Sequence, residues 1–172
     1  MVVDHQLHSM IKKIIYVLSF CFLTQLAFAA GDSSSGTSSG SDSDNYLDQY
    51  KAAKKLINRG KKLELKGKEE LALKRYNSAY KKLLEANRLE SRNPDILNYL
   101  GFTLRKAGKY EQAENYYLQG LEIKPDHNGI NEYLGELYVK TNRIDKANER
   151  LAVLKNCKCE EYNELKEIMK NN

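Results

Sequence analysis

Residues 94–127, with the sequence PDILNYLGFTLRKAGKYEQAENYYLQGLEIKPDH, decide the fold of this chain of 172 residues. Apolar residues recur three or four positions apart in this stretch, which is typical of helices that bury one face. Gly101 and Ala113 are small enough for two antiparallel helices to approach closely. Gly108 can take the left-handed conformation that ends the first helix, and Pro125 ends the second. The stretch therefore predicts one helical hairpin.

The same pattern of residues occurs three times along the chain. Tyr99-Leu100-Gly101 returns as Tyr133-Leu134-Gly135 after 34 residues, and an earlier copy begins at Gly60. The shared positions are Gly60, Leu63, Gly67, Ala72, Tyr76 and Ala79 in the first copy, Gly101, Leu104, Gly108, Ala113, Tyr117, Gly120 and Pro125 in the second, and Gly135, Tyr138, Asn142, Ala147, Leu151, Leu154 and Cys159 in the third. Because a single helical hairpin cannot bury its apolar face, three stacked copies are about the smallest stable array.

These spacings resemble those of the tetratricopeptide repeat family. The resemblance implies an all-α protein, an α-solenoid of three helical hairpins at about 53–93, 94–127 and 128–159. Residues 160–170 continue the helical spacing with charges between the apolar positions, so we expect them to form a C-terminal capping helix that covers the last repeat. The folded domain is predicted to span residues 45–172.

The first copy is longer than the others. Gly60 and Gly101 lie 41 residues apart, which is seven more than the next interval. Since the helical spacing continues without a breaking residue, we predict a lengthened second helix from about Lys68 to Leu89 that projects beyond its neighbours. The alternative is a kink or a short loop near Asn87.

Residues 1–29 have the features of a signal peptide. A pair of lysines precedes an apolar run from Ile14 to Leu26, and small residues around Ala29 suit a signal peptidase. We predict Sec-dependent export of a bacterial protein to the periplasm with cleavage near Ala29, and Met10 is an alternative start. A second alternative is an uncleaved segment that anchors the protein in the membrane.

Residues 30–44 consist almost entirely of Ser, Gly and Asp, with nothing that a core could bury. They are predicted to be a disordered linker. In the whole chain, 41% hydrophobic and 30% charged residues indicate a globular protein, and 3 Cys are too few for a fold built on disulfides.

The resemblance also implies a binding surface, because members of this family bind ligands on the concave face formed by the first helix of each hairpin. Aromatic side chains flanked by amide and charged groups suit an extended or helical peptide. The predicted partner-binding residues are Lys54, Asn58 and Lys61 in the first repeat, Asn98, Tyr99, Phe102 and Arg105 in the second, and Glu132, Tyr133, Glu136 and Lys140 in the third. For Tyr99 and Tyr133 the alternative is simple packing in the core between repeats.

Some cytosolic members of the family use Lys, Asn and Arg in this groove to clamp the terminal carboxylate of a chaperone tail. The corresponding positions here are Ile57, Lys61, Tyr99, Gly129 and Tyr133. Only one of these is basic and none is Asn. We therefore do not expect that clamp, and we expect a protein partner in the cell envelope instead.

Positive charge is concentrated in the first hairpin. Residues 51–92 contain fourteen Lys or Arg against five Glu, whereas residues 93–172 contain twelve basic and thirteen acidic residues. This excess favours a weak contact with an anionic surface, and the alternative is an ordinary solvated face. No nucleic-acid-binding motif accompanies the charges, so nucleic acid is not an expected partner.

Cys157 and Cys159 lie between the last repeat helix and the capping helix. The alternatives for this pair are a disulfide that fixes the turn, a redox or metal-binding pair, and two inert residues. Two thiolates are too few ligands for a zinc site, so we expect no metal and no cofactor. The sequence has no glycine-rich phosphate loop, HExxH motif or Ser-His-Asp set, and no catalytic residues are predicted.

The predicted function is therefore that of an exported, non-enzymatic interaction scaffold that binds a peptide or helix of an envelope partner. The alternative is a thiol-redox or metal-handling accessory protein that uses Cys157 and Cys159. The oligomeric state stays open.

Overall fold

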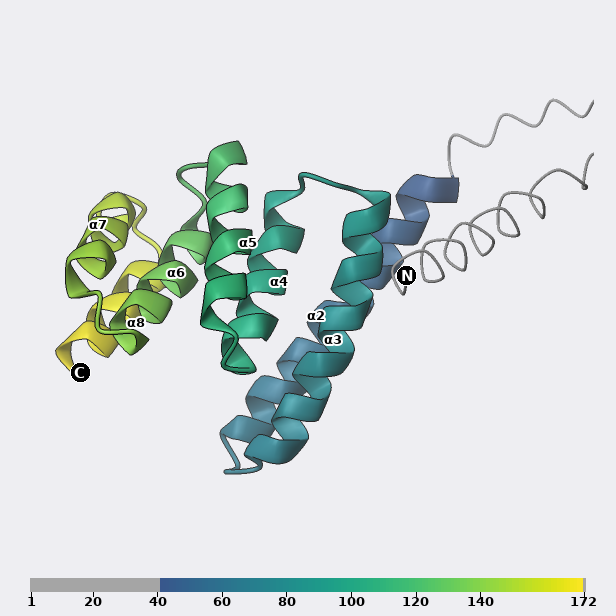
Figure 1. Ribbon diagram of the computed structural model, residues 1–172, viewed down its shortest axis with the longest axis horizontal. Helices are drawn as coiled ribbons and strands as arrows, with labels where there is room; N and C mark the ends of the chain where they lie inside the picture. The colour runs from purple at the N-terminus through teal and green to yellow at the C-terminus, as the bar shows by residue number, and fades with distance from the viewer. Residues whose placement is uncertain (1–40, 172) are drawn as a thin grey trace, which may run out of the picture. The chain divides into compact units, whose positions relative to one another are not determined.

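The computed structural model describes residues 41–171, which form seven α-helices and contain no strand (Figure 1). The predicted signal peptide and most of the predicted linker lie outside the described residues. The helices are α2 (Ser41–Glu64), α3 (Glu69–Leu89), α4 (Pro94–Lys106), α5 (Tyr110–Ile123), α6 (Asn128–Lys140), α7 (Ile144–Leu154) and α8 (Glu160–Lys170). None of these seven helices is both long enough and apolar enough to cross a membrane.

The helices form three hairpins in chain order, α2 with α3, α4 with α5, and α6 with α7. The hairpins stack through contacts of α3 with α4 and of α5 with α6, and α8 packs on α6 at the C-terminal end (Figure 1). Buried side chains from neighbouring hairpins join into continuous core clusters. The predicted all-α solenoid of three hairpins and a capping helix is confirmed.

Two close contacts determine how the helices pair within the first two hairpins. Gly60 on α2 lies against the ring of Tyr76 on α3, and Gly101 on α4 lies against the ring of Tyr117 on α5. Each glycine is so close to its ring that a methyl group would overlap it. In the third hairpin the equivalent glycine, Gly135, instead contacts Leu165 of the capping helix.

The turns follow from a few residues with special backbone conformations. Gly67, Gly108 and Asn142 follow the first helix of each hairpin and have φ angles of 66°, 74° and 57°. Glycine adopts this left-handed region freely, and asparagine does so more readily than most residues. At the start of α4 the Asn93 side chain accepts hydrogen bonds from the backbone N–H groups of Asp95 and Ile96.

The first hairpin is longer than the other two. Helix α3 runs without interruption to Leu89, so the predicted long helix is confirmed and there is no loop near Asn87. One end of the α2–α3 hairpin extends past α4 and α5 (lower part of Figure 1). The residues of α3 that hold it in the core are Ala72, Tyr76, Ala79, Leu83 and Ala86.

The start of the folded region differs from the prediction. Helix α2 begins at Ser41, so the last four residues of the predicted linker 30–44 are helical. Ser and Asp, which made this segment look like a linker, are also the residues that favour the first turn of a helix. Further along α2, Tyr46 and Tyr50 pack against the core and so anchor the N-terminal part of this helix.

Candidate functional site

The first helices of the three hairpins share a row of aromatic side chains. We define the aromatic row as Tyr50 from α2, Tyr99 and Phe102 from α4, and Tyr133 from α6. The ring centres of Tyr50 and Tyr99 are 5.8 Å apart, and those of Phe102 and Tyr133 are 5.0 Å apart. Because each of these two contacts joins neighbouring first helices, the row links all three hairpins.

Two lysines of α2 lie over this row. The Lys54 Nζ atom is 5.4 Å from the ring centre of Tyr50 and 5.9 Å from that of Tyr99. The Lys61 Nζ atom is 5.1 Å from the ring centre of Phe102 and donates a hydrogen bond of 3.0 Å to the Tyr133 hydroxyl. The distances from each ammonium group to the ring centres suit an attraction between the cation and the ring face.

Neither Lys54 nor Lys61 forms an ion pair within residues 45–171, where side chains are described. Both are exposed. Burial raises the pKa of Tyr133, so its hydroxyl keeps its proton while it accepts the Lys61 hydrogen bond. The two ammonium groups are therefore exposed positive charges without an ion-pair partner among the described side chains.

Two other cations on this face are already paired. Arg105 of α4 forms an ion pair with Glu136 of α6, and only 11% and 16% of these side chains are exposed. Lys106 of α4 pairs with Glu64 of α2 at 2.9 Å. These pairs join adjacent first helices, so their role is to hold the face together.

The structure corrects the expected position of three predicted binding residues. Phe102 is only 1% exposed, and Asn98 and Glu132 are buried as well. Tyr76 of α3 packs edge-on against Phe102 from one hairpin, and Tyr133 covers it from the other. Phe102 therefore belongs to the core beneath the face rather than to its surface.

The other predicted residues remain accessible to different degrees. Tyr99 and Tyr133 are half-buried. Each packs against the core and still reaches the surface, so core packing and partner binding are both compatible with their position. Arg105 and Glu136 are largely enclosed in their ion pair. The exposed members of the predicted set are Lys54, Asn58, Lys61 and Lys140.

Acidic side chains gather where α6 meets the capping helix. Burial is the main cause that raises the pKa of Glu132 well above its usual range, helped by a hydrogen bond with Glu164 of α8 and by the negative charge of Glu136. The folded state therefore favours the protonated form of Glu132. The sequence did not reveal this interaction, because Glu132 and Glu164 belong to different helical segments.

A surface cleft of about 470 Å³ lies at the C-terminal ends of α4, α6 and α8. It contains three residues of the predicted set, Arg105, Glu136 and Lys140. Its other lining residues are Lys106, Tyr110, Val139, Ile168 and Asn171. Sequence reasoning missed this contribution of α8, although the helical spacing of residues 160–170 indicated a helix near the last repeat.

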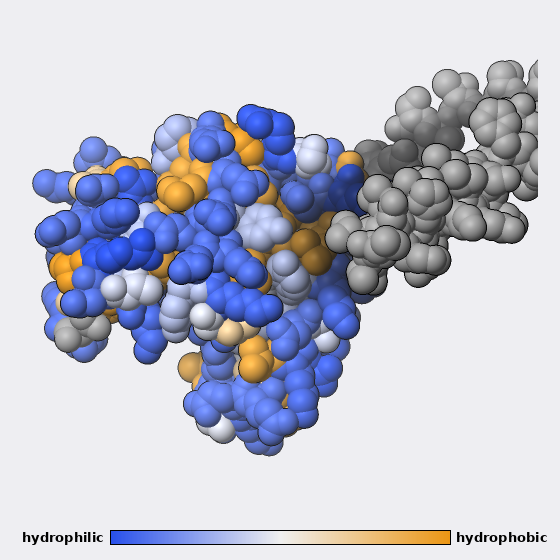
Figure 2. Space-filling model, in the orientation of Figure 1, coloured by the Kyte–Doolittle hydropathy of each residue, from blue (hydrophilic) through white to orange (hydrophobic). Residues whose placement is uncertain are grey.

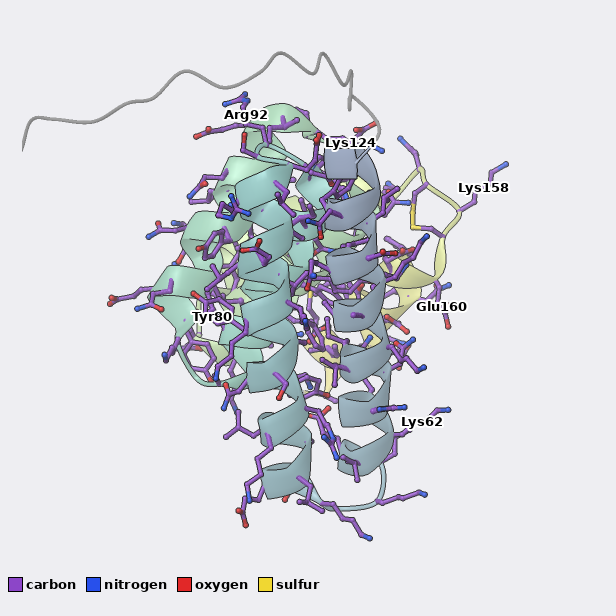
Figure 3. All side chains as sticks on the ribbon, turned by 90° about the vertical axis from the view of Figure 1, so that its right-hand side faces the viewer. Lys62, Tyr80, Arg92, Lys124, Lys158 and Glu160 are labelled. Carbon is purple, nitrogen blue, oxygen red and sulfur yellow. A yellow bond between two sulfur atoms is a disulfide. The ribbon has the colours of Figure 1, made fainter. Side chains whose placement is uncertain are left out.

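Cys157 and Cys159 form a disulfide in the turn between α7 and α8 (Figure 3). Their Cα atoms are 5.1 Å apart, and both residues pack against the core. Lys158 between them has a φ angle of 51° and points outward. Of the alternatives for this pair, the disulfide is the one found, and bonded sulfurs provide no thiolate for a metal ion.

Comparison with known proteins supports the repeat assignment. The family model of the tetratricopeptide repeat matches residues 94–127, the same stretch that decides the fold. Protein O-mannosyl-transferase TMTC3 from Homo sapiens is 28% identical over 80 residues, which cover 46% of this chain and 9% of that protein. The matching stretch thus spans less than a tenth of the length of this relative.

Two solved structures share the fold at low sequence identity. The type III secretion translocator chaperone SycD of Yersinia enterocolitica has a TM-score of 0.52 and 15% identity, covering 70% of this chain and 89% of SycD. The Arabidopsis OM64 TPR domain has a TM-score of 0.51 and 16% identity, covering 72% of this chain and 99% of that domain.

Proposed function

We propose that this tetratricopeptide repeat chain is an exported interaction scaffold that binds a peptide or helix of a protein partner in the bacterial cell envelope. The observation that carries the proposal is that two lysines without an ion-pair partner, Lys54 and Lys61, lie above the aromatic row. Rings and cations on one surface offer a partner both apolar contact and charge. SycD, which shares the fold, is described as a translocator chaperone, which supports a role in handling proteins.

The spacing of the two lysines indicates which segment would fit. Lys54 and Lys61 are seven residues apart on α2, which corresponds to about 10 Å along a helix. An extended peptide covers this length in about three residues. Because side chains two or four residues apart share a face of an extended segment, a partner with two acidic side chains at such a spacing could reach both ammonium groups.

Crosslinking and mass spectrometry on the intact envelope would identify the partner, and variants of α2 would test the site. Lys54→Glu with Lys61→Glu should abolish capture of the partner. The matched control is Lys124→Glu with Lys155→Glu, which makes the same charge change at two exposed lysines that follow α5 and α7. Equal loss with both pairs would show nonspecific charge attraction and would contradict the proposed site.

The proposed export depends on residues 1–29, which lie outside the described part of the chain. The signal has a lysine pair, an apolar run and small residues before Ala30. Cell fractionation followed by mass spectrometry of the purified protein should show a periplasmic chain that begins near Ala30. A chain in the cytoplasm that retains its first residues would contradict export.

The thiol-redox or metal-handling role remains the alternative. The disulfide joins the only two cysteines of residues 41–171, and both are half-buried against the core of the second and third hairpins. These observations favour a bridge that fixes the turn before α8. The alternative would need the bridge to open during function.

A further inference from the structure

The turn between α2 and α3 is a second surface that the proposed groove does not explain. We define the hairpin tip as residues 65–68, which connect the two long helices. All four residues are exposed, and this end of the hairpin extends past α4 and α5 (Figure 1). Because it projects, the tip can touch a flat surface without displacing any other hairpin.

Leu65 is the main apolar group of the tip. Its side chain is 88% exposed, far more than the 47% of Leu71, the next most exposed large hydrophobic residue in the described chain. The turn that holds it is ordered by backbone hydrogen bonds, since Lys66 and Lys68 donate to the Leu63 carbonyl at 3.1 and 2.9 Å. The fold therefore holds the backbone at this leucine and leaves its side chain exposed.

Positive charges surround this leucine. The unpaired lysines near it are Lys62, Lys66 and Lys68, each of them exposed and without an ion pair within residues 45–171. Lys62 points away from α2 (Figure 3). The acidic neighbours Glu64 and Glu70 are engaged in ion pairs with Lys106 and Lys74. Glu69 is then the one nearby carboxylate without an ion pair among the described residues, against three such lysines. In Figure 2 this end of the hairpin is mainly hydrophilic, with little hydrophobic surface.

We propose that the hairpin tip docks on an anionic lipid bilayer, with Leu65 entering the headgroup region and the lysines contacting lipid phosphates. An exposed apolar side chain among basic residues is the combination that binds such surfaces, because burial of the leucine adds to the attraction of lysine for negative headgroups. A peptide partner would need a groove, whereas a projecting tip suits a flat surface. The proposal is independent of the groove on the first helices.

A single tryptophan can report on the tip in the full-length protein. The chain contains no Trp, so Leu65→Trp places a unique fluorophore there. With phosphatidylglycerol vesicles its emission should shift to shorter wavelength and be quenched by brominated lipid, and with phosphatidylcholine vesicles it should not. Because the fluorophore reports only its own surroundings, membrane contact elsewhere in the chain does not by itself shift its emission. Unchanged emission with phosphatidylglycerol, or an equal shift with both lipids, would overturn the proposal.

The matched control for position is Leu118→Trp on α5, a residue that is 42% exposed. Its emission should stay unchanged with either vesicle.

The control for charge compares two pairs of lysine substitutions in the Leu65→Trp background. Lys66→Glu with Lys68→Glu should weaken the vesicle-induced shift by at least about tenfold in lipid concentration, whereas Lys124→Glu with Lys155→Glu should leave it unchanged. Equal weakening by the two pairs would show attraction by net charge alone and contradict docking through the tip.

Discussion

Arg105 of α4 and Glu136 of α6 form an ion pair that is almost enclosed between the second and third hairpins. The guanidinium also lies 5.6 Å from the ring centre of Phe102 and 5.4 Å from that of Tyr133. The pair thus joins α4 and α6 beside Phe102 and Tyr133, at one end of the aromatic row.

Removing one partner of this pair should destabilise the fold. Arg105→Ala removes the cation paired with the largely enclosed Glu136 carboxylate, and we expect a loss of about 2–4 kcal/mol in the free energy of unfolding. Urea unfolding followed by circular dichroism measures this. The control is Lys170→Ala, which removes an exposed pair with Glu167 and should cost less than about 1 kcal/mol. Similar losses in both variants would contradict a structural role for the enclosed pair.

The contact of Gly101 with Tyr117 gives a second test. Gly101→Ala adds a methyl group that overlaps the Tyr117 ring, so α4 and α5 must separate, and we expect a loss of about 1–3 kcal/mol. Alanine favours a helix over glycine, so propensity alone predicts the opposite sign. Thermal unfolding would show whether the variant is less stable, as the overlap predicts, or more stable, as helix propensity predicts. A variant as stable as the parent would show that the contact of Gly101 with Tyr117 does not determine the stability of the hairpin.

The raised pKa of Glu132 predicts how stability depends on pH. An acid whose folded pKa lies above its ordinary value of 4.5 binds a proton more tightly in the folded state. Its contribution to stability is fully present below the unfolded pKa and is lost as pH rises through the folded pKa. Glu132→Gln cannot ionise, so the free energy of unfolding should fall less with rising pH in this variant than in the parent protein.

Urea unfolding of both proteins at about pH 5 and about pH 8 would measure this difference. Comparing the two proteins cancels the titration of shared groups that do not interact with Glu132, so the measured difference belongs to Glu132 together with its neighbours Glu164 and Glu136. Parallel pH profiles would show that Glu132 is ionised in the folded state.

The disulfide of Cys157 and Cys159 closes a very short loop. Replacing both residues by serine should cost no more than about 1–2 kcal/mol, because a short loop constrains the unfolded chain little. Partner capture and cellular function should be retained. If capture is retained but cellular function is lost, the thiol-redox alternative is favoured over the scaffold.

Much of the fold could be predicted because the repeated residues act locally. Gly108 and Asn142 end their helices through their own backbone conformations, and Gly101 specifies a close contact through its missing side chain. The burial of Phe102 could not be predicted in this way, since it depends on rings from α3 and α6 that meet only after the hairpins stack. The start of α2 was missed because Ser and Asp suit both a linker and a helix terminus.

The packing of Gly135 on Leu165 determines where the array ends. In the first two hairpins the second helix supplies a tyrosine to the glycine of the first, but the corresponding residue of α7 is Leu151, and the contact comes from α8. Duplicating the last hairpin in the gene would place a new helix where α8 now packs. Lengthening of the solenoid during evolution would therefore require a compensating substitution at Leu151 as well as the inserted repeat.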